Sequence, residues 1–287
     1  MKNNILSIAP FRAFFFCAGL GFAAAGSLYG QISETFESFA NGASIIGNGW
    51  RHYTTTNQPT GNSAVVHEAE DNKYATITAY GNANSFNARV LSTAVSTASP
   101  WTVSDTLNNV ISADIRYRTP GTTNNSIVYL NVQTRDAADG IGAINMGILY
   151  ENSDLLFFAD AGSSANRIKS DPLTVSVSDT AWYRFTATLT PSTGEVSFVV
   201  YEISSGQAPS VVWTATNAGL GEFKPVSIVN VEMDVSRPGS SASQFRSADF
   251  DNITVSSAIP EPAATAALML LGIGLGVVVI RRFRPQI

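Results

Sequence analysis

The fold class is decided by the stretch Trp182-Tyr183-Arg184-Phe185-Thr186-Ala187-Thr188-Leu189, which is followed by Pro191-Ser192-Thr193-Gly194 and by residues 196–203. In its first part the odd-numbered residues from 183 to 189 are apolar or aromatic, and the even-numbered residues from 184 to 188 are polar. A period of two residues predicts a strand with one buried face. Residues 191–194 are typical of a turn, so 196–203 is expected to return as the second strand of a β-hairpin.

The same alternation recurs on both sides of this hairpin. Residues 109–118 alternate in the same way, and a second hairpin is predicted around Glu151-Asn152-Ser153-Asp154. No long 3.6-residue period precedes the C-terminal tail. Turn signals at intervals of about 8–12 residues favour an all-β fold, an antiparallel two-sheet β-sandwich of about a dozen strands. The other expected strands are 65–66, 74–80, 89–95, 126–134, 143–150, 155–159, 211–215, 226–235 and 248–255.

The order of these strands resembles a concanavalin- or laminin-G-like jelly roll. The resemblance is carried by the opening Glu34-Thr35-Phe36-Glu37, by the hairpin that closes at Gly194, and by the last strand Asp249-Phe250-Asp251-Asn252-Ile253-Thr254-Val255. It implies one β-sandwich domain over residues 31–256. It also implies that the first and last strands pair and keep the two ends of the domain close together.

The C-terminal tail contains an apolar run, residues 263–280, that carries no charge. A helix of this length spans roughly 27 Å, close to the hydrocarbon thickness of a bilayer, and satisfies its own backbone hydrogen bonds there. The run therefore predicts a transmembrane helix. Clustered basic residues resist translocation, so Arg281, Arg282 and Arg284 are expected to mark its cytoplasmic end.

The order Pro260-Glu261-Pro262, apolar span, terminal arginine cluster resembles the PEP-CTERM sorting signal, here residues 257–287. The resemblance implies that an exosortase, a membrane-embedded transpeptidase of Gram-negative bacteria, recognises the Pro-Glu-Pro motif and removes the span. The protein would then pass from an inner-membrane intermediate to the outer cell surface or the extracellular matrix. A permanent single-span anchor is the alternative.

Residues 1–30 have the features of a secretory signal peptide. Lys2 and Arg12 precede an apolar core, residues 13–25, that is too short to span a bilayer comfortably. Cleavage is expected after Ala25, Gly26 or Gly30, and the Sec translocon is the expected partner. Cleavage would also remove Cys17, the single cysteine of the chain, so disulfides are excluded from the mature protein.

The mature domain is acidic. Taking the signal's two basic residues and the tail's three from the 17 of the chain, and Glu261 from its 22 acidic residues, leaves 12 against 21 and a net charge of −9. An acidic domain repels the nucleic-acid backbone, so no nucleic-acid partner is expected.

A structural calcium ion is the candidate cofactor. In many carbohydrate-binding jelly rolls such an ion lies between the first strand and the last, and hard cations prefer several oxygen ligands at one place. The resemblance implies ligands from Glu34 or Glu37 together with Asp249 or Asp251. The alternative is that these are solvated carboxylates on a sheet edge.

Enzymatic chemistry has little support in the sequence. Glu232-Met233-Asp234 resembles the first half of the β-glucanase motif Glu-x-Asp-x-x-Glu, but Ser236 or Arg237 stands where the second glutamate would be. Retaining hydrolysis requires two carboxyl groups about 5–5.5 Å apart. The two histidines, His52 and His67, lack the spacing of a zinc site or a triad. The protein is therefore expected not to be an enzyme.

Polysaccharide binding is the preferred function. Trp50 and Tyr53 lie in a loop rich in Gly, Asn and Thr and are expected to be an exposed pair on which sugar rings stack. The expected role is an exopolysaccharide-binding or structural protein of the biofilm matrix. The alternatives are a glycan-cleaving enzyme on a jelly-roll fold and a coat protein without a small ligand.

Overall fold

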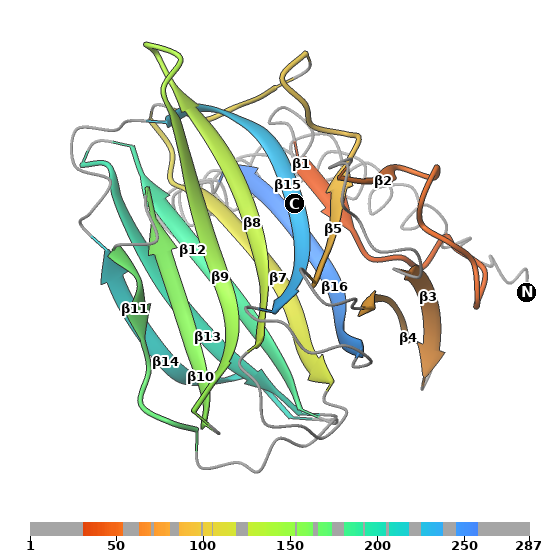
Figure 1. Ribbon diagram of the computed structural model, residues 1–287. Coiled ribbons are helices and arrows are strands. Elements are labelled where there is room, and N and C mark those ends of the chain that lie inside the picture. Colours follow the sequence, from red (N-terminus) through yellow and green to blue (C-terminus); the bar gives the residue numbers. More distant parts are fainter. Residues whose placement is uncertain are drawn as a thin grey trace, which may run out of the picture.

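The computed structural model of the chain describes residues 31–257, apart from 54–62, 70–71, 81–85, 99, 105, 119–125, 153, 163–165, 174–180, 192, 205–206, 218–224 and 238–244. The described part is all-β. Its sixteen strands form two eight-stranded antiparallel sheets, which face one another as a sandwich (Figure 1). The predicted fold class is therefore confirmed for this part of the chain.

The first sheet, sheet A, contains both ends of the described chain. Its strand order is β14 (Ser210–Asn217), β13 (Glu195–Ile203), β12 (Trp182–Thr190), β7 (Asn109–Arg118), β16 (Phe245–Ser257), β4 (Asn72–Tyr80) and β3 (Ser63–Ala69). The eighth strand, β1 (Gln31–Glu34), pairs with the end of β16, with Gln31 opposite Ser256. The expected pairing of the first and last strands is confirmed.

The second sheet, sheet B, carries the candidate site described below. Its strand order is β11 (Ile168–Lys169), β10 (Asp154–Ala161), β9 (Ile141–Glu151), β8 (Ser126–Asp136), β15 (Pro225–Arg237), β5 (Phe86–Ser92) and β2 (Trp50–His52). Its eighth strand, β6 (Trp101–Thr102), pairs with the start of β15.

The core between the sheets is built from the alternation seen in the sequence. Along β12 the residues 183, 185, 187 and 189 are buried and the residues between them are half-buried. From the opposite sheet, the ring of Phe157 meets Tyr183 and Phe185 edge-on, at centroid distances of 4.9 and 5.6 Å. Such aromatic contacts add to the free energy gained by burying apolar area, so they hold the two sheets together.

Both predicted hairpins are present. β12 and β13 pair in register from Trp182↔Ile203 to Thr190↔Glu195, and Gly194 in the turn takes a φ of 69° that suits glycine. β9 and β10 form the other hairpin, with Asn152 at a φ of 54°.

Several predicted segments lie outside the described residues. These are the signal peptide (1–30), the Pro260-Glu261-Pro262 motif, the span 263–280 and the terminal arginines Arg281, Arg282 and Arg284. No helix long and apolar enough to cross a bilayer occurs among the residues described.

Candidate functional site

The strand β15 carries two different faces. Val231, Met233 and Val235 point into the core between the sheets. The alternate residues Asn230, Glu232 and Asp234 are polar and project from the other side of sheet B, its outer face. They too are buried, with at most 7% of each residue exposed. Buried polar groups must be paired, so neighbouring strands have to supply their partners.

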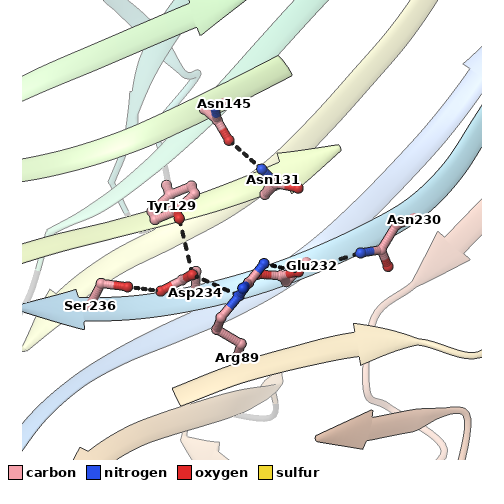
Figure 2. A network of polar contacts seen from close by, with 8 residues as sticks. All are labelled: Arg89, Tyr129, Asn131, Asn145, Asn230, Glu232, Asp234 and Ser236. Atoms are coloured by element: carbon pink, nitrogen blue, oxygen red, sulfur yellow. Dashed lines mark hydrogen bonds and ion pairs between the residues drawn. The ribbon is translucent and has the colours of Figure 1, made fainter. Parts of the chain in front are cut away.

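The register of sheet B places those partners in rows across the strands (Figure 2). Glu232 lies opposite Asn131 on β8, Asn131 opposite Asn145 on β9, and Asn145 opposite Asp160 on β10. In the adjacent row Asp234 lies between Tyr129 on β8 and Arg89 on β5. Residues from five strands therefore lie side by side on the outer face in two hydrogen-bonded groups, which together we call the polar network.

Arg89 anchors one end of this network. Its guanidinium donates two hydrogen bonds to the carboxylate of Glu232. Nη2 lies 2.9 Å from Oε2, and Nε donates to Oε1. Its Nε also lies 3.4 Å from Asp234 Oδ2. The ring of Tyr53 packs 4.0 Å from the guanidinium carbon. Because the Glu232 side chain is fully buried, the ion pair compensates a charge that would otherwise be very costly.

Asp234 has a different environment from Glu232. It accepts hydrogen bonds from the Tyr129 hydroxyl, at 3.0 Å, and from the Ser236 hydroxyl. Burial raises the pKa of Asp234 to about 7; the Ser236 hydrogen bond opposes this rise, and the charge of Glu232 adds to it. Burial, and then the charge of Asp234, also raise the pKa of Tyr129. A pKa of about 7 means that Asp234 is partly protonated near neutral pH, beside the Glu232–Arg89 ion pair.

The other end of the network is a directed chain of amides. Arg167 Nε lies 3.0 Å from Asp160 Oδ2, and Asp160 Oδ1 accepts from Asn145 Nδ2 at 2.5 Å. Because a carboxylate only accepts, Asn145 must turn its carbonyl oxygen towards Asn131, which donates at 2.6 Å. The Asn131 carbonyl oxygen is then left buried, with no donor among the described residues.

The glucanase-like pair Glu232 and Asp234 does share one face, as expected. Their residues are 0% and 1% exposed, however, and both oxygens of Glu232 are bound by Arg89. Ser236, which stands near the position of the missing second glutamate, donates to Asp234 instead. The pair is thus tied into the network rather than lining an open cleft.

Trp50 and Tyr53, the pair expected to be exposed, differ in burial. The expectation of an exposed Trp50 is wrong: it is 3% exposed, its ring lies 6.1 Å from that of Phe36, and its Nε1 is 3.4 Å from Glu34 Oε2. The reason is that residues 50–52 form β2, which pairs with β5 and turns Trp50 into the core. Tyr53 is half-buried and joins the candidate site through Arg89.

The four residues expected to bind calcium are not brought to one point. Glu34 accepts from the Phe36 backbone at 2.8 Å, and Glu37 from the Lys73 backbone at 3.0 Å. Asp249 is paired with two arginines, Arg116 and Arg118, and Asp251 accepts from Asn72 and Asn252. Over the described ranges no group of three or more His, Cys, Asp and Glu side chains is placed to hold a metal ion.

Asp251 has one further property of interest. Burial raises its pKa to about 6; hydrogen bonds from Asn72 and Asn252 oppose the rise, and the charges of Asp114 and Glu37 add to it. Asp114 is held from the other side by both nitrogens of Arg184, at 2.7 and 2.8 Å. On sheet A, Asp114 and Asp249 therefore pair with cross-strand arginines, and Asp251 accepts hydrogen bonds from amides.

The histidines contribute no cluster. His67 is exposed and stacks on Tyr74 at a centroid distance of 6.2 Å. His52 is half-buried in β2, and burial lowers its pKa. Sequence reasoning missed the main members of the network: Arg89, Tyr129, Asn131, Asn145 and Asp160. The sequence offers a single indication of them: in each case a polar residue alternates with apolar residues that face the core.

The comparisons with known proteins establish the fold alone. No family model matches the chain, and no curated protein sequence matches it. Among solved structures, an endo-1,3-β-glucanase from Streptomyces sioyaensis is 13% identical and superposes with a TM-score of 0.51, covering 82% of this chain and 98% of its own. A carbohydrate esterase from the Shiga toxin-encoding bacteriophage phi24B, 13% identical, covers 80% of this chain and 100% of its own with a TM-score of 0.48. A basic winged bean lectin, 12% identical, covers the same shares with a TM-score of 0.42.

Proposed function

We propose that this chain is an exported, non-catalytic surface or matrix protein that binds polysaccharide on the outer face of sheet B. The observation that carries the proposal is the polar network across β10, β9, β8, β15 and β5. It presents amides, a guanidinium and phenol rings on one sheet face. Sugars offer hydroxyl groups and apolar ring faces, which such groups bind through hydrogen bonds and stacking.

The charges of the face favour a neutral polysaccharide. Arg89 is paired with Glu232 and Arg167 with Asp160, so neither arginine offers a free positive charge to an anionic chain. A hydroxyl-rich, uncharged glycan therefore complements the face better than a strongly acidic one.

Export and sorting are part of the proposal. They rest on the signal-like residues 1–30 and on the Pro260-Glu261-Pro262 motif with its span and arginines. The pairing of β1 with β16 supports it, because both segments then join the sandwich at neighbouring strand ends. Mass spectrometry of the extracellular protein should find no peptide from residues 263–287 in a strain that has an exosortase. Recovery of the intact tail would favour a permanent anchor.

Binding is tested by titration calorimetry of the purified full-length protein against the producing cell's own exopolysaccharide. Gln133, which is half-buried on the outer face of β8 beside Asn131, is the position to vary. Gln133→Ala should weaken binding about tenfold through loss of one hydrogen bond. Gln207→Ala, a change at an exposed turn residue outside sheet B, is the matched control and should bind like the wild type. No saturable heat with the wild type would leave a structural coat protein.

A glycan-cleaving enzyme is the second candidate. One observation favours it: a carboxyl with a raised pKa, Asp234, lies next to an ion-paired carboxylate, Glu232, which is how acid and nucleophile differ in glycosidases. Release of reducing ends from the same exopolysaccharide, abolished in Glu232→Gln, would establish it. The first solved structure above is named as a glucanase, so a 1,3-β-glucan is the second substrate to assay.

A further inference from the structure

Apart from β1 and β6, which pair off the main strand path, each sheet ends in two outer strands, and three of these four ends are protected against pairing with another chain. β3 is covered by the segment 42–45: Gly42 N donates to Val66 O at 2.8 Å, and Val66 N donates to Ala43 O at 2.9 Å. β2 has only three residues and includes the exposed Arg51. β11 has two residues, and Lys169 on it is bound to Glu151. Cover, short length and charge are the usual protections of sheet edges.

The fourth end, β14, is not short, and among the described residues no segment is hydrogen-bonded along its outer edge. It is eight residues long, Ser210-Val211-Val212-Trp213-Thr214-Ala215-Thr216-Asn217, with no charged residue and no proline. Two of the three large apolar residues exposed in the described part lie on it: Val211 at 56% and Val212 at 41%. Its composition, rich in β-branched residues and without charge, is that of strands that add readily to other strands.

One feature limits the length of this edge. A bulge opposite Val200 and Tyr201 places Val212 outside the regular pairing with β13. Residues 213–217 remain in unbroken register with β13 and form the regular part of the edge. Thr214 and Thr216 in this part are exposed, whereas Trp213 is half-buried and stacks towards Phe157 at 6.3 Å. The inner side of β14 is thus held by the core, its other side carries the exposed Thr214 and Thr216, and β14 is the last strand of sheet A (Figure 1).

We propose that β14 pairs antiparallel with β14 of a second copy of this chain, so that two A sheets join into one continuous sheet. A second copy is the occupant because each copy brings the same uncharged strand, and a twofold axis lets it match itself. The net charge of −9 in the mature domain opposes other contacts between copies. The uncharged edge is the place where this repulsion is weakest.

The joined sheet would have a consequence for ligand binding. This step alone rests on the proposed function. A dimer formed through sheet A leaves the outer face of sheet B free on each copy, so one dimer would carry two polysaccharide faces. Two sites on one particle bind a long polymer more tightly than either site alone, without any new contact.

The test is the oligomeric state of the full-length protein in mild detergent, with micelles in excess of protein, by sedimentation velocity. A single edge pair is small compared with a standard interface, so the wild type should dimerise with a Kd of about 10–100 µM. Val212→Lys should raise that Kd at least about tenfold, because each copy would carry an added charge beside the otherwise uncharged edge at which the two strands pair. Ile141→Lys is the matched control: it removes an exposed apolar side chain, 68% exposed, and adds the same charge at the start of β9.

Hydrogen exchange supplies a second readout that does not depend on a variant. Amides of residues 213–217 should become more protected as the wild-type concentration rises, and those of β2 and β11 should not. A wild type that stays monomeric to about 200 µM overturns the proposal. So does a dimer that Val212→Lys leaves unchanged, since the apolar tail would then be what associates. Polysaccharide binding by a strictly monomeric protein would support the proposed function and contradict the proposed dimer.

Discussion

At the scale of single residues, the structure shows how two carboxylates on one strand acquire different properties. Glu232 is held by the two nitrogens of Arg89, whereas Asp234 is held by hydroxyl groups. A guanidinium compensates a buried charge, and a hydroxyl does so far less. Neither partner is near in sequence: Arg89 and Tyr129 come from other strands. The sequence therefore shows the carboxylates but not which of them keeps a proton.

Arg89→Ala should be strongly destabilising. It leaves the fully buried Glu232 without its cation, which costs about 3–5 kcal/mol of the free energy of unfolding. Urea denaturation followed by circular dichroism measures it. Arg51→Ala, the control at an exposed arginine on the neighbouring strand β2, should change stability by less than about 0.5 kcal/mol. Equal effects of the two substitutions would contradict this account of the ion pair.

Stability should fall as the pH rises from about 4 to about 7. The folded-state pKa of Asp234, about 7, and that of Asp251, about 6, lie above the unfolded value of 3.8. In this range the folded state binds more protons than the unfolded state, so raising the pH favours unfolding. The lowered pKa of His52 acts in the opposite direction. The measurement is therefore the difference in melting temperature between the wild type and Asp234→Asn across this range. The melting temperature of the wild type minus that of Asp234→Asn should fall as the pH rises towards 7. A difference that stays constant would refute the raised pKa of Asp234.

At the scale of elements, hairpins were predictable and long-range pairs were not. The register of β12 with β13 follows from local alternation and a turn at Gly194. The neighbours of β15 lie far earlier in the chain: Tyr129 on β8 is 105 residues before Asp234, and Arg89 on β5 is 143 residues before Glu232. Three short strands, β2, β6 and β11, are too brief to show a period. Because β2 is too short to show a period, the sequence did not reveal that Trp50 points into the core.

Gly147 on β9 illustrates what register adds. It lies opposite Tyr129 on one side and Phe158 on the other, and these two rings meet edge-on at 5.9 Å. A Cβ atom at position 147 would lie 2.0 Å from Val128 O and 2.6 Å from Tyr129 Cα. Glycine is therefore required by close approach of the neighbouring backbone, which no local pattern reveals.

Gly147→Ala should destabilise the protein by about 1–3 kcal/mol, because β8 and β9 must move apart. The same movement should lengthen the Asn131–Asn145 hydrogen bond and weaken the proposed polysaccharide binding. Gly140→Ala is the comparison, since its added Cβ would meet only the end of the Asp136 side chain. Thermal unfolding of both variants measures the difference. A Gly147→Ala protein as stable as Gly140→Ala would show that the strands adjust freely.

At the scale of the whole molecule, the β-sandwich and the closeness of its first and last strands were predictable from the sequence. The expected calcium ligands were not brought together, although β1 and β16 do pair. The reason is that β7 lies beside β16, and its residues Arg116 and Arg118 form ion pairs with Asp249. A count of acidic residues cannot show this, because it ignores which cross-strand neighbour each one meets.

Calcium should therefore have no effect on stability. The melting temperature of the full-length protein is expected to be the same in millimolar calcium and in excess chelator. Asp251→Ala should change the melting temperature equally under both conditions. A calcium-dependent rise in the wild type that disappears in Asp251→Ala would restore the metal site.

The position of β16 inside sheet A has a mechanical meaning for a protein held by its C-terminal end. β7 pairs with it from Ser247 to Ser257 on one side, and β4 and then β1 pair with it on the other. Tension applied along the tail would run parallel to this strand. The hydrogen bonds on both sides would resist together, in shear, instead of opening one after another. If the chain is anchored through its tail and binds a polymer on sheet B, as proposed above, a pull on that polymer would load the sandwich in the direction in which its last strand is hardest to extract.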